Sequence, residues 1–343
     1  MNRRALLTAA AGFCAAPALA QQSSLPPLKS AAPWPLGTCA RVLQFDDPQW
    51  VALATTHFSR LTPEWEMKME YVLLPDGSLR LDRADQIVNF ARAHGMAVHG
   101  HTLVWYAEDG VYFRKLTGDA FRKAYAAYIH GVVGRYRGTI KTWDVVNEPI
   151  LDDGSALRDC LWTQQLGEDH VALALTAAHE ADPDALLLIN DYNLEYTPKK
   201  RATLLKLAER VLKAGAPLHG IGTQTHVAGD VPPGAIRSAL RDIASLGLKI
   251  HVSEVDISRH EQRPVNAVEP RLDQLRVIDE LVAAYHEVPA AQRLGTTFWG
   301  VRDPDSWLNN GHEKRLIPDE PLLFDRLGRP KPLARELVKA LKA

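Results

Sequence analysis

The sequence predicts an α/β protein built as a single (β/α)8 barrel, and three observations support this prediction. Apolar, β-branched runs alternate with amphipathic helical patterns along residues 36–343, without a second linker or low-complexity segment. Eight such strand–helix units fit into roughly 300 residues, the usual size of this barrel. Polar and aromatic clusters follow seven of the strand-like runs, at the end where such barrels carry their active sites.

The expected strands are short runs rich in β-branched and other apolar residues. They cover residues 38–43, 57–62, 97–104, 140–146, 185–190, 220–225, 249–255 and 296–301. Between them, apolar residues recur at helical spacing over 84–91 before Gly95, and again over 204–212 before Gly215. A doubly wound open sheet is the alternative. No G-x-G-x-x-G motif follows an early strand, so its dinucleotide-binding version has no support.

The composition is that of an ordinary globular protein. Hydrophobic residues make up 46% and charged residues 24% of the chain, which excludes a disordered, collagen-like or disulfide-dense protein. Lys and Arg number 40 against 41 Asp and Glu, for a formal net charge of −1. Because no basic excess exists, we expect no nucleic-acid partner.

The N-terminus has the pattern of a secretory signal peptide over residues 1–20. Arg3 and Arg4 precede a short apolar run, and Ala18-Leu19-Ala20 fits the small-x-small cleavage pattern. The run is too short to span a membrane, so we expect export to the periplasm or the exterior, by either the Sec or the Tat route. Residues 21–35 then form a leader, and residues 36–343 form the barrel.

Two cysteines remain after such a cleavage, Cys39 and Cys160. In an oxidising compartment they can pair or stay as thiols, and we favour two unpaired, buried cysteines. Neither their spacing nor their neighbours suggest a zinc site.

Carboxylates and tryptophans dominate the expected rim of the barrel. Glu148 ends the fourth strand-like run beside Asn147, and Glu254 ends the seventh beside Asp256. Cleavage of a glycosidic bond needs two carboxylates across a cleft, one to protonate the leaving oxygen and one to attack the anomeric carbon or activate water. Tryptophan faces suit the apolar C–H surfaces of sugar rings. The residues therefore indicate glycosidic bond cleavage by Glu148 and Glu254.

Eight motifs occur along the chain in the order T-P-E-x-E-M-K, G-H-T-L-V-W, W-D-V-V-N-E-P, N-D-Y-N, G-I-G-x-Q-T-H, S-E-x-D-I, W-G-V-x-D-x-x-S-W and P-L-L-F-D. With them the chain resembles glycoside hydrolase family 10, the retaining endo-β-1,4-xylanases, over residues 35–343. The resemblance implies hydrolysis of xylan or xylo-oligosaccharides by double displacement in a single barrel, with no cofactor and no metal. It also implies a β-linked polysaccharide or oligosaccharide as partner, and we expect a monomer.

The resemblance further implies a role for each site residue. Glu148 would be the general acid/base and Glu254 the nucleophile. Asn147 would bond the nucleophile and the sugar 2-hydroxyl, while His226 would bond Glu254 and be held by Asp256. Tyr192 would lie near the leaving-group side, and the sugars on the non-reducing side would contact Glu64, Lys68, His101, Trp105, Gln224, Trp299 and Trp307. We also expect Trp65, between Glu64 and Lys68, to bind substrate.

The chain departs from the family pattern at three positions. Trp65 stands where the family usually has asparagine, and Tyr106 and Glu108 stand where it usually has histidine and glutamine. Replacing the amide by an indole removes a hydrogen-bond acceptor and fills space. A buried sugar hydroxyl that loses its hydrogen-bond partner costs about 1–3 kcal/mol of binding free energy. A decorated or shorter xylan, or another β-linked glycan, is therefore an alternative substrate. Otherwise Trp65 simply stacks on a sugar or packs against a loop.

Two other functions remain as alternatives. His99 and His101 form an H-x-H that, with His226 and His251, could bind zinc in a metal-dependent amidohydrolase-like barrel. Amidohydrolases carry this motif on their first strand, however, and His251 lies three residues from Glu254, so it should point away from it. The second alternative is a catalytically inactive glycan-binding barrel, against which the presence of both glutamates argues.

Overall fold

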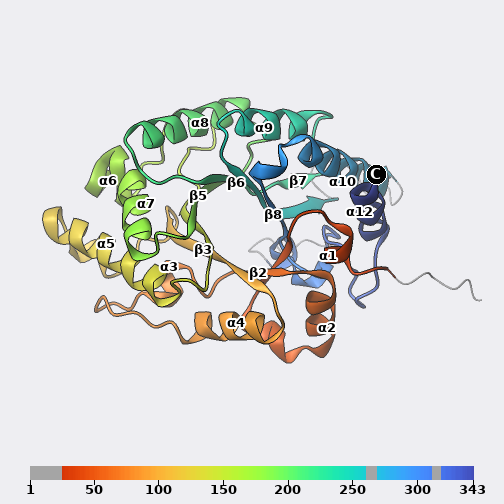
Figure 1. Ribbon diagram of the computed structural model, residues 1–343, viewed down its shortest axis with the longest axis horizontal. Helices are drawn as coiled ribbons and strands as arrows, with labels where there is room; N and C mark the ends of the chain where they lie inside the picture. The colour runs from red at the N-terminus through yellow and green to blue at the C-terminus, as the bar shows by residue number, and fades with distance from the viewer. Residues whose placement is uncertain (1–24, 260–268, 311–317) are drawn as a thin grey trace, which may run out of the picture.

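The computed structural model describes residues 25–259, 269–310 and 318–343 (Figure 1). The predicted signal peptide, residues 1–20, lies outside the described residues. The expected leader is described from Leu25 onward, and its short helix α1 (Leu28–Ala31) buries Leu28 against the core. Within the described ranges, no helix combines the length and the apolar character that crossing a membrane requires.

The strands form a closed parallel barrel, which confirms the predicted fold. Their order is β6-β5-β4-β3-β2-β1-β9-β8, and β6 also pairs with β8 to close the circle. The short β7 follows β6 in the chain. β6 pairs with the first half of β8 and β7 with its last residues, so β6 and β7 together occupy one strand position in the barrel. The bounds are β1 Leu36–Ala40, β2 Arg60–Pro63, β3 Ala97–Trp105, β4 Thr142–Asn147, β5 Leu186–Asp191, β6 Gly220–Thr223, β7 His226–Ala228, β8 Lys249–Ser258 and β9 Arg293–Phe298.

Helices surround the barrel and cover its outer face (Figure 1). The longer ones are α2 (Pro48–His57), α4 (Asp82–Ala93), α5 (Gly118–Arg135), α7 (His170–Ala181), α8 (Pro198–Lys213), α9 (Ala235–Ala244), α10 (Glu269–Glu287) and α12 (Pro332–Lys342). Short helices occur in the connections: α3 (Met69–Val72), α6 (Leu161–Leu166) and α11 (Trp307–Asn310). The helices predicted around residues 84–91 and 204–212 are α4 and α8, and each buries the apolar face that its spacing indicates, except that Leu212 at the end of the second pattern is exposed.

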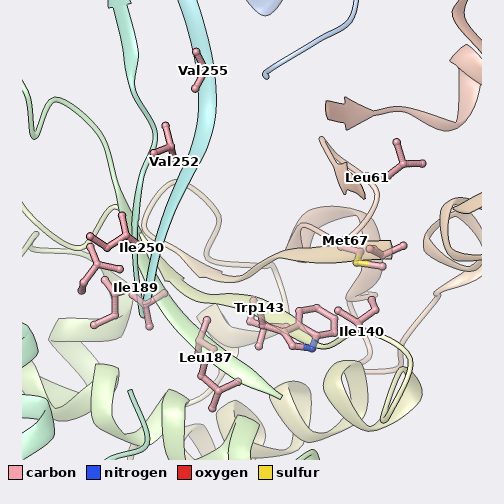
Figure 2. Close-up of a cluster of buried hydrophobic side chains, with 14 of the residues drawn as sticks. Leu61, Met67, Ile140, Trp143, Leu187, Ile189, Ile250, Val252 and Val255 are labelled. Carbon is pink, nitrogen blue, oxygen red and sulfur yellow. The ribbon is translucent and has the colours of Figure 1, made fainter. Parts of the chain in front are cut away.

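The hydrophobic core includes side chains of the strands and of the segments beside them (Figure 2). Trp143 on β4 is fully buried, and its ring lies against the backbone of Gly100 on β3. A Cβ atom at Gly100 would lie 2.0 Å from that ring. The glycine between His99 and His101 is therefore required by packing, because only a residue without a side chain leaves room for the indole.

Several strands differ in extent from the sequence prediction. β2 begins at Arg60 instead of residue 57, because helix α2 continues to His57, and β8 continues to Ser258 instead of residue 255. β1 ends at Ala40 instead of residue 43, because a 3-10 turn over Val42–Asp46 begins there and Glu66 accepts a 2.7 Å hydrogen bond from the Val42 amide. β9 ends at Phe298 instead of residue 301. The chain leaves the sheet there through Gly300, whose φ of 137° is accessible mainly to glycine.

Candidate active site

One cavity of about 580 Å³ opens at the carboxyl ends of the strands. Every site residue predicted from the sequence lines it: Glu64, Trp65, Lys68, His101, Trp105, Asn147, Glu148, Tyr192, Gln224, His226, Glu254, Asp256, Trp299 and Trp307. These residues come from segments spread over most of the chain. Parallel strands end at the same edge of a barrel, which is why the sequence clusters converge there.

Glu148 follows the last residue of β4 and points into the cavity. Its backbone is in the left-handed region, with φ of 55°, and its amide donates to the carbonyl oxygen of Asn190 at 2.7 Å. The carboxylate accepts three hydrogen bonds. Gln224 Nε2 lies 2.8 Å and Asn147 Nδ2 3.2 Å from Oε1, and Trp105 Nε1 lies 2.8 Å from Oε2. The carboxylate is thus held by donors that carry no charge.

Glu254 lies on β8 and is almost completely buried, with 4% of its surface exposed. Oε2 is 3.3 Å from His226 Nε2, and His226 Nδ1 is 2.9 Å from Asp256 Oδ2. Trp307 Nε1 donates to the same oxygen of Asp256 at 2.8 Å. The Glu–His–Asp contact that the sequence predicts is therefore present. Its basis is register, because His226 of β7 pairs with Asp256 of β8 and Glu254 lies two residues before Asp256 on the same side.

The electrostatics of this chain of contacts favour an ionised Glu254. Burial alone would lower the pKa of His226, but the carboxylates of Asp256 and Glu254 outweigh it and raise the pKa to about 10. The histidine is therefore a cation at neutral pH. Burial alone would likewise raise the pKa of Glu254, but the hydrogen bond from His226 and nearby positive charge outweigh it, and the pKa is lowered.

The amide that donates to Glu254 is that of Asn190, and not that of Asn147 as the resemblance implies. Asn190 Nδ2 lies 2.8 Å from Glu254 Oε1 and 2.9 Å from Asn147 Oδ1, while the Asn147 amide turns to Glu148. Ser253 orients Asn190 by donating to its Oδ1 at 2.7 Å. Asn190 is the first residue of N-D-Y-N and ends the fifth expected strand, so its place in the sequence was a usable signal.

The remaining polar residues of the cavity are also held in place. His101 Nδ1 lies 2.9 Å from Asp144 Oδ2, so its Nε2 is free to face the cavity. Glu64 lies 3.3 Å from Arg41 Nε and accepts from Cys39 Sγ at 3.5 Å. Lys68 Nζ is 4.7 Å from the centre of the Trp105 ring.

Two tryptophans of the cavity keep a large part of their surface open. Trp65 is 42% and Trp307 is 44% exposed. Trp65 meets Tyr71 edge to face, with ring centres 5.8 Å apart. Its indole thus packs against Tyr71 and keeps an open surface in the cavity. Stacking of a sugar on this surface stays a prediction.

The other two departures from the family pattern have different environments. Tyr106 lines the cavity, and the Arg158 guanidinium lies 4.1 Å from the centre of its ring. Glu108 is buried and accepts a hydrogen bond from the Glu70 amide at 3.1 Å. Burial raises the pKa of Glu108 to about 7. Glu108 thus binds the amide of a residue in α3, and only Tyr106 of the two lines the cavity.

Both expected thiols are unpaired. Cys39 is buried beside Glu64, as predicted, whereas Cys160 at the start of α6 is only partly buried. Burial raises the pKa of the Cys39 thiol well above its ordinary value, so the thiol stays neutral beside the carboxylate.

The H-x-H histidines belong to a buried polar network under the cavity. His99 and His101 each place a ring nitrogen 2.9 Å from Asp144 Oδ2, and ligand atoms of His99, Asp144 and His251 lie within 4.8 Å of one another. Arg60 Nη2, however, is 2.7 Å from His251 Nε2. A fixed guanidinium at this distance repels a second cation, so the set fits a hydrogen-bonded network better than a metal site.

The model of glycosyl hydrolase family 10 matches residues 28–340, and the chain belongs to this family. It is 38% identical to endo-1,4-beta-xylanase B of Paenibacillus barcinonensis, over 80% of this chain and 86% of that one. It is 36% identical to a beta-1,4-xylanase of Dictyoglomus thermophilum, over 84% of this chain and 83% of that protein. A mutant of xylanase A from P fluorescens subsp. cellulosa, solved in complex with xylopentaose, superposes with a TM-score of 0.84 at 31% identity, covering 92% of this chain and 100% of that one.

Proposed function

We propose that the protein is a retaining endo-β-1,4-xylanase that hydrolyses xylan or xylo-oligosaccharides by double displacement. The observation that carries this proposal is the pair Glu148 and Glu254 in one cavity with unlike surroundings. Glu254 contacts a cationic histidine, whereas the partners of Glu148 are neutral donors. The xylanases among the relatives support xylan as the substrate class.

In the first step Glu254 attacks the anomeric carbon while Glu148 gives a proton to the leaving oxygen. The bond between the anomeric carbon and that oxygen breaks, and an ester to Glu254 forms. This ester removes the negative charge of Glu254. Glu148, now unprotonated, takes a proton from water, which attacks the anomeric carbon and releases Glu254.

The other residues of the cavity bind and orient the sugars in this proposal. Asn190 and His226 hold the Glu254 carboxylate, and Asp256 fixes the histidine. Asn147 remains a candidate for bonding the sugar 2-hydroxyl. The sugars to the non-reducing side contact Glu64, Trp65, Lys68, His101, Trp105, Gln224, Trp299 and Trp307, and Tyr192 contacts the leaving-group side.

The N-terminal pattern supports export, with residues 1–20 as a signal peptide and residues 36–343 as the catalytic barrel. A decorated xylan is the second candidate substrate, favoured by the exposed indole of Trp65 in the cavity. Products from xylan, glucuronoxylan, arabinoxylan and mixed β-glucan, compared at equal enzyme concentration, separate these substrates.

The roles of the two glutamates are tested by Glu148→Ala and Glu254→Ala on an aryl β-xylobioside with a good leaving group. Without Glu254 no glycosyl-enzyme forms, so activity should disappear and azide should not restore it. Without Glu148 the intermediate still forms, and azide should accelerate its breakdown by replacing the water that needs a base. Equal loss in both variants, with no rescue of either, would contradict the assignment.

A further inference from the structure

Beside Glu148, the rings of Tyr106 and Tyr192 in the cavity wall contact two cations, Arg158 and Lys200, that the mechanism above does not use. The Lys200 ammonium lies 3.5 Å from the centre of the Tyr192 ring. The Arg158 guanidinium lies 5.7 Å from the same ring and 4.1 Å from the ring of Tyr106. Lys200 is fully buried and Arg158 is 8% exposed, so water screens these contacts poorly.

Arg158 connects these rings to the backbone of Glu148. Its Nε donates to the carbonyl oxygen of Glu148 at 3.0 Å, and its amide donates to the carbonyl oxygen of Pro149 at 2.8 Å. Its Nη2 donates to Asp152 Oδ1 and to the Tyr192 hydroxyl, both at 2.7 Å. Asp152 and Tyr192 therefore fix the guanidinium in place, and the guanidinium in turn binds the backbone of Glu148, the proposed acid/base.

Glu148 needs such a support because its backbone is strained. A φ of 55° lies in the left-handed region, which is unfavourable for a residue with a side chain. The amide of Glu148 is held by Asn190 and its carbonyl by Arg158, so the two sides of this residue are fixed by different strands and loops. Loss of the second contact would let the peptide rotate and carry the carboxyl group away from its place.

We propose that Arg158 is a positioning residue that keeps the carboxyl group of Glu148 in line with the leaving oxygen, with Tyr106 and Tyr192 holding the guanidinium plane. The inference rests on the proposed acid/base role of Glu148. Arginine suits the task because one planar group stacks on a ring and donates in several directions, which a lysine ammonium cannot do. Proton transfer requires hydrogen-bond reach, and a displacement of about 1 Å costs on the order of a hundredfold in rate.

The test compares leaving groups, because only a poor leaving group needs the proton from Glu148. We measure kcat/KM of Arg158→Met on phenyl β-xylobioside and on 2,4-dinitrophenyl β-xylobioside. We expect a loss of at least thirtyfold with the phenyl substrate and of less than threefold with the dinitrophenyl substrate. Arg158→Lys should show the same selective loss to a smaller extent. The matched control is Arg114→Met, since Arg114 is an exposed arginine paired with Asp109, and both rates should be unchanged.

A loss that is equal for the two substrates, or no loss, would overturn the inference. Such a result would mean that Arg158 supports folding or sugar binding in general. Melting curves accompany each variant, and where Arg158→Met does not fold the comparison is decided by Arg158→Lys. Glu148→Ala is measured with the same two substrates. If Glu148→Ala shows no selective loss with the phenyl substrate, the proposed role of Glu148 is wrong. If Glu148→Ala shows the selective loss but the Arg158 variants lose both activities equally, only the inference about Arg158 is refuted.

Discussion

Replacing Trp65 by asparagine tests whether the indole sets the preference for plain or decorated sugars. Trp65 is 42% exposed in the cavity, between Glu64 and Lys68 in the chain, and its ring cannot accept a hydrogen bond from a sugar hydroxyl. An amide at this position can both donate and accept. One recovered hydrogen bond in the transition state, worth ~1.4 kcal/mol, corresponds to a rise of up to about tenfold in kcat/KM on unsubstituted xylo-oligosaccharides.

The assay measures kcat/KM on xylotetraose and xylopentaose for the wild type, Trp65→Asn and Trp65→Leu. Leucine has nearly the size of asparagine but no amide, so it separates hydrogen bonding from the removal of bulk. Loss of the edge contact with Tyr71 should cost both variants about 0.5–1.5 kcal/mol of stability, visible in melting curves. The reasoning is refuted by an unchanged or lowered kcat/KM in Trp65→Asn, or by an equal gain in Trp65→Leu.

Three further predictions concern stereochemistry, pH and packing. NMR of the first-formed sugar should show retained anomeric configuration, and an inverted product would disprove the double displacement. The pKa of His226 is raised from 6.5 to about 10, so its stabilising contribution is complete below about pH 6.5 and is lost as pH rises through about 10. Urea titrations of the wild type should therefore show the free energy of unfolding falling over this pH range, and His226→Asn should show a smaller fall. The same pH dependence in both proteins would contradict this. Gly100→Ala should lower the free energy of unfolding by about 1–3 kcal/mol because its Cβ meets Trp143, while a similar melting temperature would show that the ring can move.

The sequence predicted the barrel well because strand and helix signals were both strong. In α4, for example, the apolar residues at spacings of three and four are the ones that the structure buries. The ends of β1 and β9 were predicted less well. The turn after Ala40 depends on Glu66, a residue 24 positions away from Val42. Local patterns contain no information about such a partner, so strand ends set by tertiary contacts could not be read from them.

The cavity residues were predicted in two ways: the hydrophobic pattern located the strand ends at which Glu148 and Glu254 were expected, and the family resemblance added the residues expected to contact the sugars. The hydrogen bonds among them were not. Whether Asn147 or Asn190 donates to Glu254 depends on side-chain rotamers, and these are fixed by neighbours such as Ser253 and Gly222. Arg158 was missed for another reason. It lies in a loop without a strand signal, and only the folded chain brings it under the carbonyl of Glu148.

The surroundings of the two glutamates explain how one cavity can assign them different tasks. His226 is held as a cation by Asp256, and an ionic donor stabilises the carboxylate of Glu254 more than a neutral donor would. Glu148 receives only uncharged donors from its partners Asn147, Gln224 and Trp105. The difference favours the ionised form of Glu254, the form that its proposed role as nucleophile requires. In the proposed double displacement, ester formation removes the negative charge of Glu254 that faces Glu148, so one arrangement would serve proton donation in the first step and proton removal from water in the second.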